Sequence, residues 1–152
     1  MSKVKNYIDF MSQAYLFFTL PKYDVSIKKQ IINDKKIYSI DTGFIKAIAF
    51  QFSEDQGRIL ENAVFLELKR RGKNIYYYEG ECDFLVKEGM KIVQAIQVAS
   101  TLNPEIRERE LKGITKAMQE FKLKEGTLVT LDIEETLGKI SIIPLWKFLL
   151  EN

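Results

Sequence analysis

Residues 82–100, CDFLVKEGMKIVQAIQVAS, contain the pattern that decides the fold of this chain. Two β-rich runs flank a Lys-Glu-Gly-Met stretch at residues 87–90, which is typical of a hairpin turn. Along the first run, alternation places Phe84 and Val86 on one face and Asp83 and Leu85 on the other. The stretch therefore predicts a pair of strands, with a carboxylate inside the first of them.

The second run of this stretch carries an amide in an apolar strand. Gln97 shares a face with Ala95 and Ala99, while Ile96 and Val98 point the other way. An amide between small residues indicates a cavity or a second polar partner. The alternative is a glutamine on the solvent side of a half-exposed sheet, and the pattern leaves both interpretations open.

The flanking sequence completes an α/β pattern. Helical spacing predicts helices over 55–71 and from Pro104 to about residue 121, with a closing helix that has Pro144 in its first turn. Further strands are expected near 74–78, 127–131 and 139–143. Upstream, we expect a helix over 4–16, a strand broken at Pro21, a polar stretch over 28–36, a short strand over 35–40 and a turn at 41–43. This order predicts a mixed sheet with helices packed against it.

The composition limits the chemistry that the chain can perform. It has 152 residues, a net charge of +2, one cysteine and no histidine. Its length fits one domain with one buried core. The lack of histidine excludes Ser-His-Asp and Cys-His nucleophilic sites and His-ligated zinc, and the lone Cys82 excludes a disulfide framework. Carboxylates, lysines, amides and a hard metal ion remain. With no long apolar run and no signal peptide, we expect a cytoplasmic protein without a membrane partner.

Two carboxylates stand out against the apolar pattern. Burying an isolated carboxylate is costly unless it is paired or binds a metal, so Asp83 is either a site residue or a solvated strand end. Glu61 lies in the middle of the apolar helix over 55–71. It is either a site residue, a surface partner of Arg58 or Lys69, or simply solvated.

The order of several segments resembles one known family. These are KKIYSIDTGF, GRILENAVFLELKRRG, ECDFLV, AIQVAS, RERE and IIPLWKFLL. Together, over about residues 5–151, they resemble the C-terminal domain of archaeal-type ATPases, where an AAA-like ATPase and a winged helix precede a PD-(D/E)xK restriction-endonuclease-like domain. The resemblance implies a core of helix, three-stranded meander, crossover helix and strand over 46–152. Residues 1–45 would be a helix plus two-stranded extension, the remnant of the winged helix.

The resemblance also implies a catalytic site and exposes two departures from it. In the superfamily, a helix acid, a strand Asp and a Glu-x-Lys on the next strand hold a divalent metal that activates water against a phosphodiester. These positions map to Glu61, Asp83, Gln97 and Ala99. Asp83 and Gln97 would hold Mg²⁺ or Mn²⁺, with Glu61 assisting. Glutamine can ligate magnesium but brings no charge, and alanine cannot stabilise developing charge as lysine does.

Two hypotheses about function follow. The first is a nuclease-like domain that engages DNA as a weak or degenerate Mg²⁺-dependent phosphodiester hydrolase. The second is a non-catalytic interaction or regulatory domain that contacts an ATPase or another protein. An AAA-like ATPase would act in cis or in trans, because this chain has no ATP site. Its Gly-Lys pairs at residues 72–73 and 138–139 lack the Ser or Thr and the upstream glycine of a P-loop.

Two basic clusters are candidate contacts for nucleic acid. Lys69, Arg70 and Arg71 follow one another at the end of the first long helix, where they would also complement the helix dipole. Arg107 and Arg109 begin the second long helix within the sequence RERE. They would contact phosphates or frame the site, or pair with glutamates on a solvated helix face.

Overall fold

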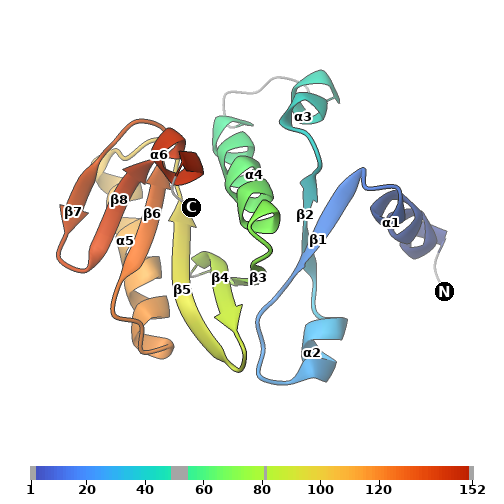
Figure 1. Cartoon of the computed structure of the whole chain (residues 1–152), viewed down its shortest axis with the longest axis horizontal. Helices are drawn as coiled ribbons and strands as arrows, with labels where there is room; N and C mark the ends of the chain where they lie inside the picture. The colour runs from blue at the N-terminus through green and yellow to red at the C-terminus, as the bar shows by residue number, and fades with distance from the viewer. Residues whose placement is uncertain (1–2, 49–54, 81, 151–152) are drawn as a thin grey trace.

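The computed structural model describes residues 3–48, 55–80 and 82–150, and these form an α/β fold with two sheets (Figure 1). The N-terminal part contains α1 Lys3–Gln13, β1 Phe17–Pro21, α2 Ile27–Ile32, β2 Lys35–Ser39 and α3 Thr42–Ile48. The following part contains α4 Asp55–Arg70, β3 Asn74–Tyr78, β4 Cys82–Glu88, β5 Lys91–Val98, α5 Pro104–Glu120, β6 Gly126–Thr130, β7 Glu135–Leu137, β8 Ile140–Pro144 and α6 Leu145–Leu150.

The larger sheet has six strands in the order β3-β4-β5-β6-β8-β7. Strands β3, β4 and β5 form an antiparallel meander. After the α5 crossover, β6 pairs parallel to β5 and β8 pairs parallel to β6, while β7 adds an antiparallel edge. The predicted mixed sheet and its element order from α4 to β6 are therefore confirmed.

Apolar side chains cover both faces of this sheet. On one face, Val64 and Phe65 of α4 lie in a cluster with Phe84 and Val86. On the other face, helix α5 packs against a second cluster that contains Leu85. The predicted alternation of these three strand residues is thus confirmed. Burial of a strand on both faces explains why β4 is apolar along most of its length.

The ends of the two long helices follow local rules. Gly72, with φ 66°, ends α4, because the backbone N–H groups of Gly72 and Lys73 donate to the carbonyls of Lys69 and Leu68 at 2.9 and 3.0 Å. Asn103 caps α5 by accepting from the Ile106 N–H at 2.8 Å, and Pro104 follows in the first turn. Both predicted boundaries are confirmed.

The sequence interpretation was wrong at several short elements. The expected polar stretch over 28–36 overlaps α2, which spans Ile27–Ile32, buries none of its residues and shows no apolar periodicity. The expected turn at 41–43 is the start of α3. Strand β7, with three residues, was missed. Pro144 is the last residue of β8, paired in register with Thr130, rather than part of the closing helix.

The N-terminal part is attached to the larger sheet through β1 and β2. Strands β1 and β2 pair with each other in antiparallel fashion. After β1, the Tyr23 N–H donates to the Tyr77 carbonyl on β3 at 2.8 Å. At the end of β2, the Ser39 N–H donates to Asn62 Oδ1 of α4 at 2.8 Å, and Asn62 Nδ2 donates to the Ser39 carbonyl at 3.0 Å. These contacts place β2 beside α4 and so bring β2 side chains to the edge of the larger sheet.

Candidate functional site

Strands β4 and β5 separate at one end, and the candidate site lies there. Their last paired residues are Phe84 and Ile96. Beyond them, side chains replace the ladder, because the Asp83 N–H donates to Gln97 Oε1 at 3.0 Å and Asp83 Oδ2 accepts from the Val98 N–H at 3.1 Å. The two strand residues selected from the sequence, Asp83 and Gln97, are thus neighbours.

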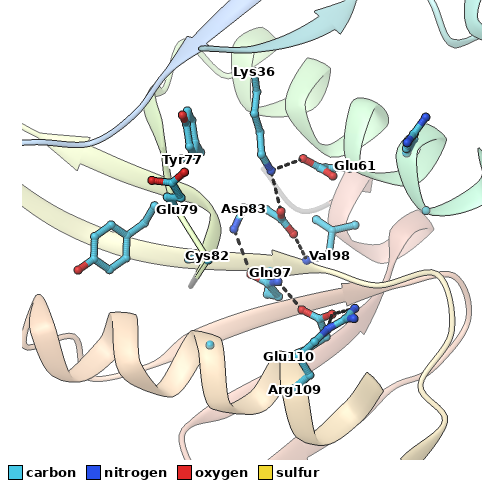
Figure 2. Close-up of a pocket in the computed structure, with 15 residues that line it drawn as sticks. Lys36, Glu61, Tyr77, Glu79, Cys82, Asp83, Gln97, Val98, Arg109 and Glu110 are labelled. Atoms are coloured by element: carbon cyan, nitrogen blue, oxygen red, sulfur yellow. Dashed lines mark hydrogen bonds and ion pairs between the residues drawn. The ribbon is translucent and has the colours of Figure 1, made fainter. Parts of the chain in front are cut away.

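A lysine from β2 joins the two candidate carboxylates (Figure 2). Lys36 Nζ lies 2.8 Å from Glu61 Oε1 and 2.9 Å from Asp83 Oδ1. The Tyr38 hydroxyl, two residues along β2, also donates to Glu61 Oε1 at 2.7 Å. In this group of four side chains, one ammonium group bridges two carboxylates, and a hydroxyl binds one of them. We call it the Lys36 cluster.

The Lys36 cluster corrects two predictions. Glu61 pairs with Lys36 rather than with Arg58 or Lys69, the partners considered from the sequence. Asp83 was predicted to share a face with Leu85, yet it binds Lys36, which also binds Glu61 of α4. The pairing of β4 with β5 ends here, and the β3–β4 register shifts between Tyr76 and Tyr78. Strict alternation is therefore not maintained at Asp83.

One ammonium group cannot fully balance two carboxylates in a buried place, and the pKa values reflect this. Burial, reinforced by the nearby Glu61, raises the pKa of Asp83 to about 6 despite the opposing effect of Lys36. Burial lowers the pKa of Lys36, but the charges of Asp83 and Glu61 outweigh this and raise it overall. Burial and the Glu61 charge also raise the pKa of the Tyr38 phenol. Asp83, Lys36 and Tyr38 therefore each keep a proton to a higher pH than the isolated side chain would.

A second polar link runs from β5 to α5. Gln97 Nε2 donates to Glu110 Oε2, and Glu110 Oε1 accepts two hydrogen bonds from the Arg109 guanidinium, at 2.6 and 3.0 Å. Glu110 is buried, with 6 % of its surface exposed. Together with Lys36, Glu61 and Asp83, these residues line a cleft of about 590 Å³ (Figure 2). One alternative for the RERE segment was pairing of its arginines with glutamates on a solvated face. Arg109 does pair with Glu110, but Glu110 is buried.

The donor groups in the cleft do not fit a bound Mg²⁺ or Mn²⁺ as they are arranged. An ammonium group already lies between the Glu61 and Asp83 carboxylates, where a cation would be needed. Both polar ends of Gln97 are used, one by the Asp83 N–H and one by Glu110. Ala99, the position of the expected lysine, lies in the apolar cluster beneath α5. The metal assignment to Asp83 and Gln97 stays a prediction.

The basic candidates are dispersed rather than gathered at the cleft. Arg70 and Arg71 bind Glu67. The hydrogen bond from Arg70, helped by Arg71, lowers the pKa of Glu67 to about 2, although burial alone would raise it. Lys69 lies over the Phe18 ring. Arg107 pairs with Glu135 at 2.6 Å. Of the five basic candidates, Arg109 lines the cleft. Nucleic-acid contact by these five residues stays a prediction.

Cys82 borders the cleft but is chemically quiet. Its thiol is buried and donates to the carbonyls of Phe84 and Ile96 at 3.4 and 3.2 Å. Burial, with the nearby Asp83 charge, raises the pKa of the thiol to about 12. The thiol is therefore protonated at neutral pH and is a poor nucleophile.

Lys36 and Glu110 were not selected from the sequence, although each has a recognisable signal. Lys36 and Tyr38 are two apart on a strand and so share a face, and Tyr38 is buried. Glu110 is four residues from both Ile106 and Ile114, which places it on the apolar face of α5. A charged side chain on a buried face is the signal that both positions share.

Family comparison separates the chain near residue 55. Residues 56–148 match the domain of unknown function DUF4143. The chain belongs to this family. Residues 1–55 match a second domain of unknown function, DUF8612. Lys36 therefore lies in one matched region, and the two carboxylates that it contacts lie in the other. The predicted boundary at residue 45 stays a prediction.

Curated relatives are longer than this chain. It is 37 % identical over 164 residues to an uncharacterized protein of Methanocaldococcus jannaschii, covering 95 % of this chain and 35 % of that protein. It is 28 % identical over 99 residues to an uncharacterized protein of Haemophilus influenzae, covering 63 % of this chain and 24 % of that protein. No solved structure matches significantly. Within the described residues, no helix is both long and apolar enough to cross a membrane.

Proposed function

We propose that this chain is a nuclease-like domain of the PD-(D/E)xK type that acts as a non-catalytic interaction domain for an AAA-like ATPase. The observation that carries the proposal is the position of Lys36 Nζ, within 2.9 Å of carboxylate oxygens from both Glu61 and Asp83. An internal cation there lies between the two acids that a nuclease would use to hold a metal. The element order from α4 to β6 supports the nuclease-like fold.

The remaining polar groups support the same proposal. Gln97, in the position of a metal-binding glutamate, links Asp83 to Glu110 instead. Catalysis by a metal-dependent nuclease needs open ligand positions and a group that stabilises developing charge. Ala99 cannot supply that group, and Lys36 is already held between two carboxylates. The residues thus serve to join β2, α4, β5 and α5 rather than to bind a substrate.

A plasmid-nicking assay tests the proposal directly. The purified chain is incubated with supercoiled DNA and Mg²⁺ or Mn²⁺, beside the variants Asp83→Ala and Lys36→Met. We expect the rate of plasmid nicking with each of the three proteins to equal the rate in the buffer control. Nicking by the wild-type chain that is lost in Asp83→Ala would overturn the proposal.

The Lys36→Met variant is the matched control for a concealed nuclease. It removes the ammonium group but keeps a long apolar side chain, so both carboxylates become available. If this variant alone nicks DNA in a metal-dependent way, the domain is an inhibited enzyme rather than a non-catalytic one, and the proposal fails. A non-cleaving variant whose circular dichroism spectrum matches wild type supports it.

A further inference from the structure

Helix α1 contacts β1 but leaves most of its apolar side chains exposed. It has 11 residues and lies at the outer edge of the fold, beside β1, and none of its side chains whose burial is described is buried (Figure 1). Its large apolar side chains Val4, Tyr7, Phe10 and Met11 are between 41 % and 66 % exposed. A helix of this length is marginal in water without tertiary packing. Packing of another surface against these exposed side chains would therefore stabilise α1.

An apolar groove continues from α1 toward α4. It has a volume of about 670 Å³ and lies between α1, the two-stranded sheet, α3 and α4. Phe44, Ile37 and Leu16 are about half exposed along it. Its apolar lining is formed by Met11, Leu16, Phe17, Ile37, Phe44 and Ile45. Contiguous exposed apolar surface of this kind marks an interaction site.

The comparison with longer relatives indicates what covers this surface. The Methanocaldococcus jannaschii protein resembles this chain over 35 % of its own length, so nearly two thirds of it lies outside the match. Another domain on the same polypeptide is present at high effective concentration, and it can cover an apolar face without a separate binding event. A face this apolar fits such a permanent contact better than a transient one.

We propose that the groove and the outer side of α1 dock a folded domain of the same, longer polypeptide, which presents a mostly apolar face to them. This rests on the proposed function as an interaction domain and identifies the surface that carries it. The cleft around the Lys36 cluster then lies behind the docking surface, because Lys36, Arg58 and Glu61 line both the cleft and the groove.

Hydrogen exchange in the full-length Methanocaldococcus jannaschii protein tests the docking surface. Protection factors in its segment that aligns with α1–α3 are compared with those of residues 3–48 in the 152-residue chain. We expect at least about tenfold higher protection in the full-length protein, because packing removes local opening. Equal protection in both proteins would overturn the proposal. Segments aligned with β4 and β5 are the internal control and should change little.

Two measurements decide between this occupant and others. Sedimentation of the 152-residue chain should show a monomer, and a dimer with a protected α1 would assign the groove to a second copy. Flotation with vesicles of neutral and anionic phospholipid should show no binding, and binding would assign the groove to a membrane. Either result overturns the proposal.

Substitutions in the full-length protein give a further check. Serines at the positions aligned with Tyr7 and Phe44 should return the α1–α3 segment to rapid exchange, while a serine aligned with exposed Trp146 on α6 should not. The assignment would be contradicted if the serines aligned with Tyr7 and Phe44 caused no loss of protection, or if the serine aligned with Trp146 caused the same loss. Cleavage in the nicking assay would remove the proposed function without altering these data, so the two proposals can fail separately.

Discussion

The regions on either side of residue 55 differ in how they use apolar side chains. Residues 55–150 bury them in two clusters, one on each face of the six-stranded sheet. Among the described residues of 3–48, Leu20 and Tyr38 are the apolar side chains that are buried. Most of the large exposed apolar side chains of the described chain lie in 3–48, namely Val4, Tyr7, Phe10, Met11, Tyr15, Leu16, Val25, Ile27, Ile31, Ile32, Ile37, Ile40 and Phe44.

This difference shows that a region can have regular secondary structure and still depend on other parts of the protein. The second region supplies most of the buried apolar side chains of the described residues. The first holds to it through a few contacts, among them the stacking of Tyr38 on Phe65 with ring centroids 4.1 Å apart. Variants on either side of residue 55 test this difference.

Phe65→Ala should cause the largest loss of stability. Phe65 is 1 % exposed, and it contacts Tyr38 of the first region as well as Phe84 of the sheet. Loss of a buried phenylalanine costs about 3–5 kcal/mol of unfolding free energy. Urea denaturation measures this, with Phe10→Ala as the exposed control, for which the change should stay within about 0.5 kcal/mol. Similar losses for both variants would refute the contrast between the regions.

Lys36→Met should destabilise the chain by about 2–3 kcal/mol, because it leaves two largely buried carboxylates without a cation. Solvent screening at the partly exposed lysine keeps the loss below that of a fully buried pair. Urea denaturation again measures the loss. Combining this change with Glu61→Gln and Asp83→Asn should restore most of the stability. If the triple variant is no more stable than Lys36→Met, then lost packing rather than charge is responsible.

Stability should fall as the pH rises from about 4 to about 6, through Asp83. The folded-state pKa of Asp83, about 6, is above its ordinary value of 3.8, so the native chain binds more protons than the unfolded chain between these values. The contribution of this group to stability is fully present below about pH 4, and on the order of 3 kcal/mol of it is lost by about pH 7. The difference between wild type and Asp83→Asn in urea denaturation isolates it. A difference that does not vary with pH would contradict the raised pKa.

The smallest effect is expected at the exposed end of α4. Lys69→Ala together with Arg70→Ala should change the unfolding free energy by less than about 1 kcal/mol, because Arg70 is mostly exposed and Arg71 continues to pair with the buried Glu67. Arg71→Ala should cost more, since Arg71 is mostly buried and binds both Glu67 and the Phe148 carbonyl. Salt-dependent binding of duplex DNA that weakens in the double variant would support the nucleic-acid prediction for Lys69 and Arg70. Unchanged binding would remove it.

Much of the second region could be predicted from the sequence, because its elements are long and periodic. The hairpin at residues 87–90, the end of α4 at Gly72 and the start of α5 at Pro104 all have local signals that the structure confirms. The six-residue α2 and the three-residue β7 are too short to show a period.

The candidate site was predictable only in part. Asp83, Gln97 and Glu61 were selected because each interrupts an apolar pattern, and the structure brings all three to one cleft. Lys36 was missed because it is separated from Asp83 by 47 residues and reaches it only through the attachment of β2 to α4. The chemistry of the cleft depends on this long-range contact, which no local spacing encodes.

Cys82 gives this chain a native reporter of its own opening. The thiol lies between the strands where β4 leaves β5, and it is the sole cysteine of the sequence. A thiol-alkylating reagent can therefore modify one place, and it can do so only in molecules in which that strand junction has come apart. The alkylation rate would follow local breathing beside the Lys36 cluster in the unmodified protein, with no engineered label.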